Sequence, residues 1–177
     1  MQKNIGLIGF GVMGCQIAMK LIEGECNVLI FDIDPEASAR GKKLGCEVYN
    51  NPALVAQRTN IILISLPSPK HVAEVVCDEV IGLLSGAASG SVIIDTSTVD
   101  PTTSQTMANK ASRLEVGYVD APVLGRPKSV GKWTLPVGGN SNDIEKARGV
   151  LSLLAERIVH VGPIGSGNNV TGISNVV

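Results

Sequence analysis

A glycine-rich turn near the N-terminus constrains the fold of this chain more than any other feature. The stretch GFGVMG fits the pattern G-x-G-x-x-G, follows the strand-like segment NIGLI and runs into an amphipathic helical pattern. In such a turn Gly9 permits a tight bend, Gly11 leaves room for a pyrophosphate, and Gly14 lets the helix pack closely on the strand. Free amides at the helix N-terminus then face the phosphates. The residues that we expect at this dinucleotide site are Gly9, Phe10, Gly11, Val12, Met13 and Gly14.

A carboxylate at the end of the second strand-like segment supports this prediction. Asp32 follows Gly14 by 18 residues, close to the roughly 20 expected for a residue that binds the ribose hydroxyls. Asp32 would repel a 2′-phosphate, and Ile33 and Asp34 offer no cation to bind one. We therefore expect NAD rather than NADP. The alternative is that Asp32 is only a turn residue or a helix cap before Pro35.

Strand-like and helical segments alternate along the rest of the chain. A helix between two successive strands allows those strands to pair in parallel. We therefore expect an α/β fold with a doubly wound, mostly parallel Rossmann-type sheet and helices on both faces. The expected strands are 4–8, 28–31, 47–49, 60–65, 91–94, 116–119, 134–137 and 158–161. The expected helices are 13–22, 35–44, 52–57, 70–84 with a break near Gly82, 101–114, and 142–157 with a capping box at Asn142 and Glu145.

The composition is that of a globular chain without the charge pattern of a nucleic-acid or membrane-surface protein. Hydrophobic residues make up 44% of the 177 residues and the net charge is −1. We therefore expect neither nucleic acid nor membrane among its partners. The four cysteines are far apart, and no CxxC pair or histidine cluster predicts a metal site. These thiols favour a reducing compartment, namely the cytoplasm, or an organelle matrix if a transit peptide has been removed.

The C-terminal part differs in composition from the rest. Residues 162–169 are rich in Gly, Asn, Ser and Pro, which is typical of a linker. Apolar residues then recur at helical spacing at Val170, Ile173 and Val177. We expect a dinucleotide-binding domain over residues 1–162, followed over 163–177 by a linker and the start of a helix.

Four stretches together resemble the β-hydroxyacid dehydrogenases, the family typified by 3-hydroxyisobutyrate dehydrogenase. They are IGFGVMGCQIAMKL at the start, Ser65-Leu66-Pro67, the run DTST at 95–98 with Pro101, and DAPVLG at 120–125. Their order and spacing match the family over the whole chain. The resemblance implies hydride transfer between NAD(P) and a small anionic hydroxyacid or semialdehyde. It also implies an all-helical domain after this one, and we expect a homo-oligomer in the full-length form.

The resemblance also assigns roles to individual residues. Leu66, Pro67 and Thr98 would lie at the cofactor, and Ser97 with residues 124–126 would lie at the substrate. Within that segment Leu124 replaces a family serine, Gly125 is retained, and Arg126 replaces a glycine. Arg126 is either a solvated loop residue or a cation for an anionic substrate, because arginine binds carboxylates bidentately. For Trp133, His71 and His160 we expect structural roles.

One departure from the family bears directly on chemistry. The family places its acid/base lysine in a pattern like GxGxxxKxxNN, and here that position is Thr171, with Asn175 at the second asparagine. These two residues share a helix face because they are spaced i, i+4. Burial can tune a lysine to titrate near neutral pH but not a threonine hydroxyl, and losing a positioned proton donor costs about 10²–10⁴ in rate.

Three hypotheses follow from this departure. The chain is the cofactor-binding portion of an NAD-linked hydroxyacid dehydrogenase, with Thr171 as an engineered or natural replacement of lysine. Alternatively, it is a non-catalytic dinucleotide-binding module, or part of a related reductase of semialdehydes, glyoxylate or imines. Fold alone does not select among them.

Overall fold

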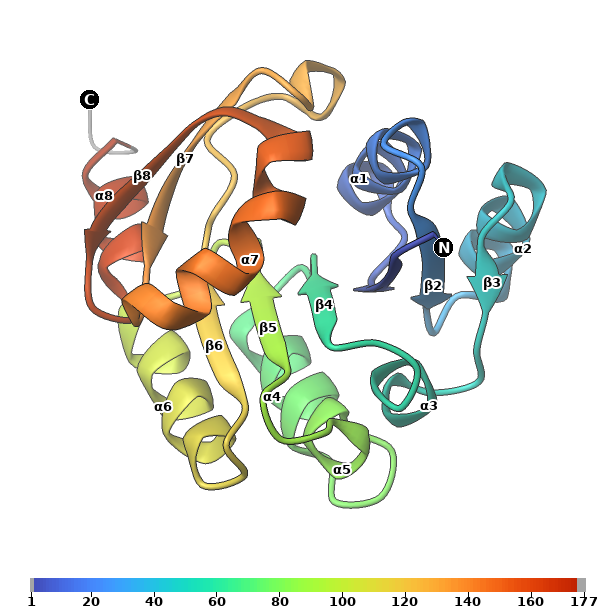
Figure 1. Ribbon diagram of the computed structural model, residues 1–177, viewed down its shortest axis with the longest axis horizontal. Helices are drawn as coiled ribbons and strands as arrows, with labels where there is room; N and C mark the ends of the chain where they lie inside the picture. The colour runs from blue at the N-terminus through green and yellow to red at the C-terminus, as the bar shows by residue number, and fades with distance from the viewer. Residues whose placement is uncertain (1, 175–177) are drawn as a thin grey trace.

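The short apolar runs of the chain form one eight-stranded sheet in the computed structural model, which describes residues 2–174. The strand order is β3-β2-β1-β4-β5-β6-β7-β8. Figure 1 shows β3 and α2 at one end of the molecule and β8 and α8 at the other. The strands are β1 (Asn4–Ile8), β2 (Asn27–Phe31), β3 (Glu47–Val48), β4 (Ile61–Ile64), β5 (Val92–Asp95), β6 (Gly117–Asp120), β7 (Trp133–Gly138) and β8 (Ala155–Gly162).

Helices cover both faces of the sheet. Apolar residues of α1, α2 and α7 belong to the core on one face, and those of α3 to α6 belong to the core on the other. The helices are α1 (Val12–Glu23), α2 (Pro35–Leu44), α3 (Pro52–Ala56), α4 (Pro69–Cys77), α5 (Leu83–Gly86), α6 (Pro101–Ser112), α7 (Ser141–Leu154) and α8 (Ser166–Ser174), with a short 3-10 helix η1 (Pro127–Ser129).

The strand β4 shows why these sequences form a two-sided core. All of its residues are buried. Ile61 and Leu63 contribute to one core, and Ile62 and Ile64 contribute to the other. Successive side chains of a strand point to opposite faces, so a continuous apolar run is what a strand covered on both sides requires.

The direction of the strands confirms the predicted doubly wound, mostly parallel sheet. Every pairing from β3 to β6 is parallel, as is that of β7 with β8. The exception is the antiparallel contact between β6 and β7, at Asp120 and Gly138. The strand order reverses at β1, which lies between β2 and β4. In open α/β sheets, ligands bind beyond the carboxyl ends of the strands at such a switch point.

Two predicted boundaries near the C-terminus are wrong. The helix expected over 142–157 ends at Leu154, because residues 155–157 pair with β7 as the start of β8. Its cap is Asn140, whose Oδ1 accepts a hydrogen bond from the Asn142 N–H at 2.8 Å, so Asn142 is not the capping residue. A side chain that caps two residues ahead competes with the capping-box pattern, and the sequence does not distinguish them.

The segment expected as a linker is also only partly irregular. Residues 166–169 form the first turn of α8, and Gly167 and Asn168 are buried in the domain. This helix contacts β7 and β8. The proposed boundary between residues 162 and 163 stays a prediction, and the start of a helix expected within residues 163–177 is present as α8, from Ser166 through Ser174.

We predict that Gly14→Ala lowers the free energy of unfolding by about 2–4 kcal/mol, because its Cβ would overlap the backbone carbonyl of Gly9. Gly149→Ala is the matched control, since Gly149 lies exposed in α7 with no atom within 4 Å of an added Cβ. It should stabilise the chain by up to about 1 kcal/mol through helix propensity. Urea unfolding of both variants measures the contrast; equal effects would contradict this account of the turn.

Candidate functional site

The glycine-rich turn has the geometry that its sequence predicts. Gly9 has φ of 94°, which glycine adopts without strain, and a Cβ there would overlap the Ser65 carbonyl oxygen of the neighbouring loop. Gly11, at the start of α1, has no atom within 4 Å of an added Cβ, so its backbone faces open space. The first turn of α1 can therefore present its backbone amides to an anion.

A cavity of about 840 Å³ lies in front of this turn. Its walls come from the turn and the start of α1, the end of β2, the loop after β4, and one side of α4. The predicted site residues that line it are Gly9, Gly11, Val12, Met13, Gly14, Asp32, Leu66 and Pro67. The structure thus brings together segments that are more than fifty residues apart in the sequence.

Asp32 stands at the rim of this cavity, fixed by two backbone amides. Its Oδ2 accepts a hydrogen bond from Phe10 N–H at 2.6 Å, and its Oδ1 accepts one from Asp34 N–H at 2.8 Å. The cap of α2 is Asp34, which accepts from Glu36 N–H. Asp32 is therefore oriented by the turn itself, and its remaining lone pairs can accept further hydrogen bonds. The ring of Phe10 is buried in the core and does not line the cavity.

A hydrogen bond to Ser97 anchors the loop of Leu66 and Pro67. The Leu66 N–H donates to Ser97 Oγ at 2.9 Å, and Ser97 is 4% exposed. The backbone N–H of Ser97 in turn donates to Asp95 Oδ1 at 2.9 Å. Ser97 thus supports a cavity wall without lining it, and Thr98 is exposed beside it.

Asp95 ends β5 and is fully buried. Its Oδ2 accepts a hydrogen bond from the Tyr118 hydroxyl at 2.8 Å. Burial raises the pKa of Asp95 to about 6, although the hydrogen bonds from Ser97 and Tyr118 lower it and the charge of Asp120 adds to the rise. Loss of water therefore outweighs the stabilising hydrogen bonds at this carboxyl.

A second buried carboxylate, Asp120, ends β6 and holds the start of α8. Its Oδ1 accepts a hydrogen bond from Gly165 N–H at 2.7 Å, and its Oδ2 accepts one from Asn168 N–H at 2.9 Å. A negative charge at a helix N-terminus is stabilised by the free amides and the helix dipole. The close approach of α8 to Asp120 requires glycine at position 167, because a Cβ there would lie 2.8 Å from Asp120 Oδ2.

Thr171 lies on the buried side of α8. It is 2% exposed, and its Oγ1 donates a hydrogen bond to the Asn168 carbonyl at 2.6 Å. The hydroxyl hydrogen of Thr171 is therefore bonded to a carbonyl of its own helix, that of the residue three positions earlier. Asn175, the other residue predicted for this face, lies outside the described residues.

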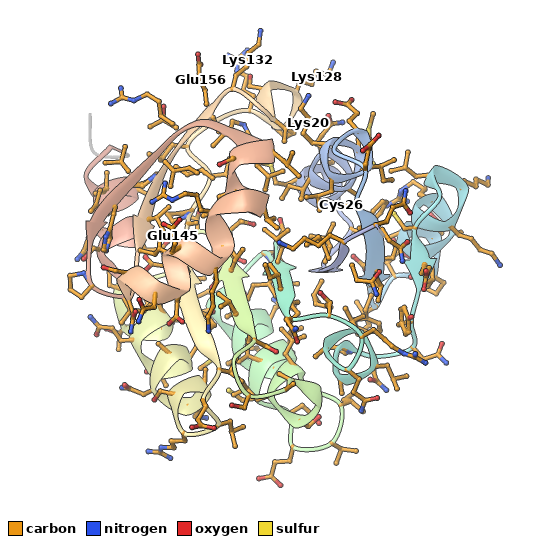
Figure 2. The ribbon with its side chains drawn as sticks, in the orientation of Figure 1. Lys20, Cys26, Lys128, Lys132, Glu145 and Glu156 are labelled. Atoms are coloured by element: carbon orange, nitrogen blue, oxygen red, sulfur yellow. The ribbon has the colours of Figure 1, made fainter. Side chains whose placement is uncertain are left out.

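Of the residues predicted to lie at the substrate, Ser97 follows β5, whereas Leu124, Gly125 and Arg126 lie on the loop between β6 and β7. None of the four lines the cavity in front of the glycine-rich turn. Leu124 is 38% exposed and Arg126 is exposed. Gly125 packs against Trp133, whose Nε1–H donates to the Arg126 carbonyl at 3.0 Å. Trp133 is 2% exposed, so the structural role expected for it is confirmed. Figure 2 shows Lys20, Lys128 and Lys132 toward the end of the molecule that carries this loop.

One wall of the cavity is formed by α4, and none of its residues was among the predicted site residues. His71, Glu74, Val75 and Asp78 all line the cavity, although His71 was expected to be structural. Their spacing of three and four residues places them on one side of a helix. The usable signal was that this helix begins directly after the cavity loop at Pro67.

Three further observations concern the described residues as a whole. Among residues 2–174, no group of three or more His, Cys, Asp or Glu side chains is arranged to hold a metal ion. No helix within the same range is long and apolar enough to cross a membrane. A second cavity, of about 500 Å³, lies beside Cys26 (Figure 2) and α7, and none of the predicted site residues lines it.

We predict that Asp95 makes stability pH-dependent in a defined direction. Its pKa is about 6 in the folded chain and about 3.9 when unfolded, so its contribution is fully present below about pH 4 and lost as pH rises through about 6. The difference in unfolding free energy between the unsubstituted chain and Asp95→Asn should fall by about 3 kcal/mol across this window. Denaturant unfolding at a series of pH values measures it.

Asp100→Asn is the control with the opposite sign. Hydrogen bonds from the Thr103 side chain and backbone lower the pKa of Asp100. Its contribution is therefore present above its unfolded pKa and lost as pH falls. A pH-independent difference for Asp95→Asn would show that its carboxyl does not titrate as described.

Comparison with known proteins identifies the family of this chain. The family model described as the NAD binding domain of 6-phosphogluconate dehydrogenase matches residues 4–162. A probable mitochondrial 3-hydroxyisobutyrate dehydrogenase of Dictyostelium discoideum is 33% identical over 99% of this chain and 55% of its own length. A 2-(hydroxymethyl)glutarate dehydrogenase of Eubacterium barkeri is 35% identical over 98% of this chain and 58% of its own length.

A solved structure of a 3-hydroxyisobutyrate dehydrogenase has the same fold as this chain. The 3-hydroxyisobutyrate dehydrogenase of Mycobacterium tuberculosis, in a structure with L-serine, has a TM-score of 0.93 and 26% identity, covering 99% of this chain and 60% of that one. The chain thus spans little more than half the length of these relatives, and the resemblance to the β-hydroxyacid dehydrogenases is confirmed. The protein belongs to the family of the NAD-binding domain of 6-phosphogluconate dehydrogenase.

Proposed function

We propose that this chain is the NAD-binding portion of an oxidoreductase that acts on 3-hydroxyacids such as 3-hydroxyisobutyrate, which it would oxidise to the semialdehyde. The observation that carries the proposal is the 840 Å³ cavity, in which the glycine-rich turn and Asp32 meet. NAD would supply the hydride acceptor. The amides at the start of α1 would bind its pyrophosphate, and the loop of Leu66 and Pro67 would border its reactive end.

The preference for NAD over NADP rests on the charge of the cavity wall. Asp32, Glu74 and Asp78 line it, and none of its described residues is a lysine or arginine. Asp32 is anchored with lone pairs free for the ribose hydroxyls. A 2′-phosphate would meet this carboxylate without a compensating cation, which disfavours NADP.

The substrate class rests on the relatives. Two of them are named for 3-hydroxyisobutyrate and 2-(hydroxymethyl)glutarate, which are both hydroxyacids. Leu124 and Arg126 are exposed on one loop and are free to face a substrate. In this proposal Arg126 would bind the substrate carboxylate, and the homo-oligomeric assembly of the complete protein stays a prediction.

A second candidate function is a dinucleotide-binding module without chemistry. The observation that favours it is Thr171, which is buried and donates its hydroxyl hydrogen to the Asn168 carbonyl. It carries no charge and no titratable proton near neutral pH to replace the lysine of the family pattern. Reading the gene beyond Val177 separates the candidates: a continuing frame for a helical domain favours the enzyme, and a stop codon favours the module.

We also propose a reducing location, such as the cytoplasm or an organelle matrix. All four cysteines are free thiols in the structure. Burial raises the pKa of Cys46 to about 11, and the charge of Cys15 adds to the rise. A protonated, buried thiol is chemically inert, as expected of a cysteine with a packing role.

We predict that the chain binds NAD and that Asp32→Ala weakens this binding by about 10–100-fold, because hydrogen bonds to a charged acceptor contribute about 1.5–3 kcal/mol. The same substitution should narrow the preference for NAD over NADP, since the repelling charge is gone. Isothermal titration calorimetry with both cofactors measures the two effects. Glu36→Gln removes an equal charge four residues away and should leave both affinities unchanged. No heat with either cofactor would refute the cofactor assignment.

We predict that Thr171→Lys, made in the complete protein encoded by the gene, raises NAD-dependent oxidation of a 3-hydroxyacid by about 10²–10⁴-fold. The lysine would restore an acid/base group at the family position. Thr171→Met, which has an uncharged side chain of extended length, should give no gain. NADH formation at 340 nm reports the rate, and a lysine variant as slow as the methionine variant would argue against the dehydrogenase proposal.

A further inference from the structure

His71 lies in the cavity wall on the first turn of α4, as the third residue of that helix. We propose that its Nε2–H donates a hydrogen bond to a phosphate oxygen of the bound dinucleotide. This assignment rests on the proposed function and adds a side chain to the backbone amides of α1 that would bind the phosphates. It gives the wall contributed by α4 a direct role in binding.

The neighbouring serine can hold the tautomer that this role requires. Ser68 caps α4, and its Oγ accepts the His71 backbone N–H at 3.4 Å. The same Oγ lies 2.6 Å from His71 Nδ1. Because one lone pair of the hydroxyl serves the cap, its hydrogen is available to donate to Nδ1. Neutral imidazole then carries its own hydrogen on Nε2, and the protonated ring keeps that donor as well.

The far nitrogen is available for a ligand. Among the described residues, no acceptor is hydrogen-bonded to His71 Nε2, and the side chain is exposed at the cavity. The other histidine of the chain differs in this respect. His160 Nε2 lies 3.0 Å from both the Gly139 and the Gly162 carbonyl oxygens, as a structural histidine does.

The charges around the cavity explain why this donor should matter. Asp32, Glu74 and Asp78 line the wall, and a dinucleotide adds the charges of its pyrophosphate. Glu74 forms an exposed pair with Lys70 at 3.9 Å, and Asp78 accepts hydrogen bonds from the amides of residues 80 and 81. Of the described residues that line the cavity, His71 alone has a side-chain nitrogen donor. A phosphate oxygen of the dinucleotide is a charged acceptor, and hydrogen bonds to charged acceptors are stronger than those between neutral groups.

Calorimetric titration of four forms of the chain with NAD, ADP and adenosine tests this assignment. His71→Phe keeps a ring but removes the donor. It should weaken the binding of NAD and ADP by about tenfold. The affinity for adenosine, which has no phosphate, should be unchanged. His71→Gln places an amide nitrogen near the Nε2 position and should retain most of the affinity. His160→Phe is the matched control and should bind all three ligands as the unsubstituted chain does. Thermal melting verifies that each variant is folded.

The outcomes separate this inference from the proposed function. No NAD binding by the unsubstituted chain would overturn both. Binding that His71→Phe leaves unchanged would overturn this inference alone. Equal losses in His71→Phe and His71→Gln would overturn it too, because they would indicate packing rather than donation, and an equal loss for adenosine would exclude the phosphate as the acceptor.

Discussion

The start of α1 packs directly on the carbonyl of Gly9, and the cofactor site depends on that contact. It is possible only because Gly9 and Gly14 lack side chains, since a Cβ at either would overlap backbone. The close turn brings the amide-bearing end of α1 to the switch point between β2 and β4. The same turn fixes Asp32 through the Phe10 amide, so the groups expected to bind phosphate and ribose are set by one piece of backbone.

Two buried carboxylates fix other segments near the ends of the strands. Asp95 and Asp120 are paired neighbours at the ends of β5 and β6. Asp95 holds Ser97, whose hydroxyl holds the loop of Leu66 in the cavity wall. Asp120 holds the first turn of α8, which carries Thr171. Burying these charges is costly unless each is satisfied by hydrogen bonds, and segments beyond the ends of the strands supply several of those bonds.

The sequence predicted those parts of the molecule that depend on local patterns. The glycine-rich turn, the buried run of β4 and the alternation of strand and helix follow from backbone sterics and from burial on both faces, which a single segment reveals. The end of α7 could not be predicted because pairing with β7 overrides helix propensity at residues 155–157. The contact of Ser97 with Leu66 spans 31 residues, and the approach of His71 to the cavity depends on how α4 docks. Long-range contacts of this kind leave no periodic signal.

The buried position of Thr171 bears on the chemistry that we propose for the complete protein. The family pattern places a lysine where this chain has a side chain that bonds to its own helix. In the proposed function, cofactor binding would depend on the turn at Gly9, and proton transfer would depend on a residue more than 150 positions away.

Amide chemical shifts of the ¹⁵N-labelled chain during titration with NAD test the central claim most directly, because they locate the ligand residue by residue. The account predicts large shifts at residues 9–14, 32–34 and 66, with little change around Gly24, Cys26 and Leu153 at the second cavity. Shifts concentrated at the second cavity, with none in the glycine-rich turn, would contradict it.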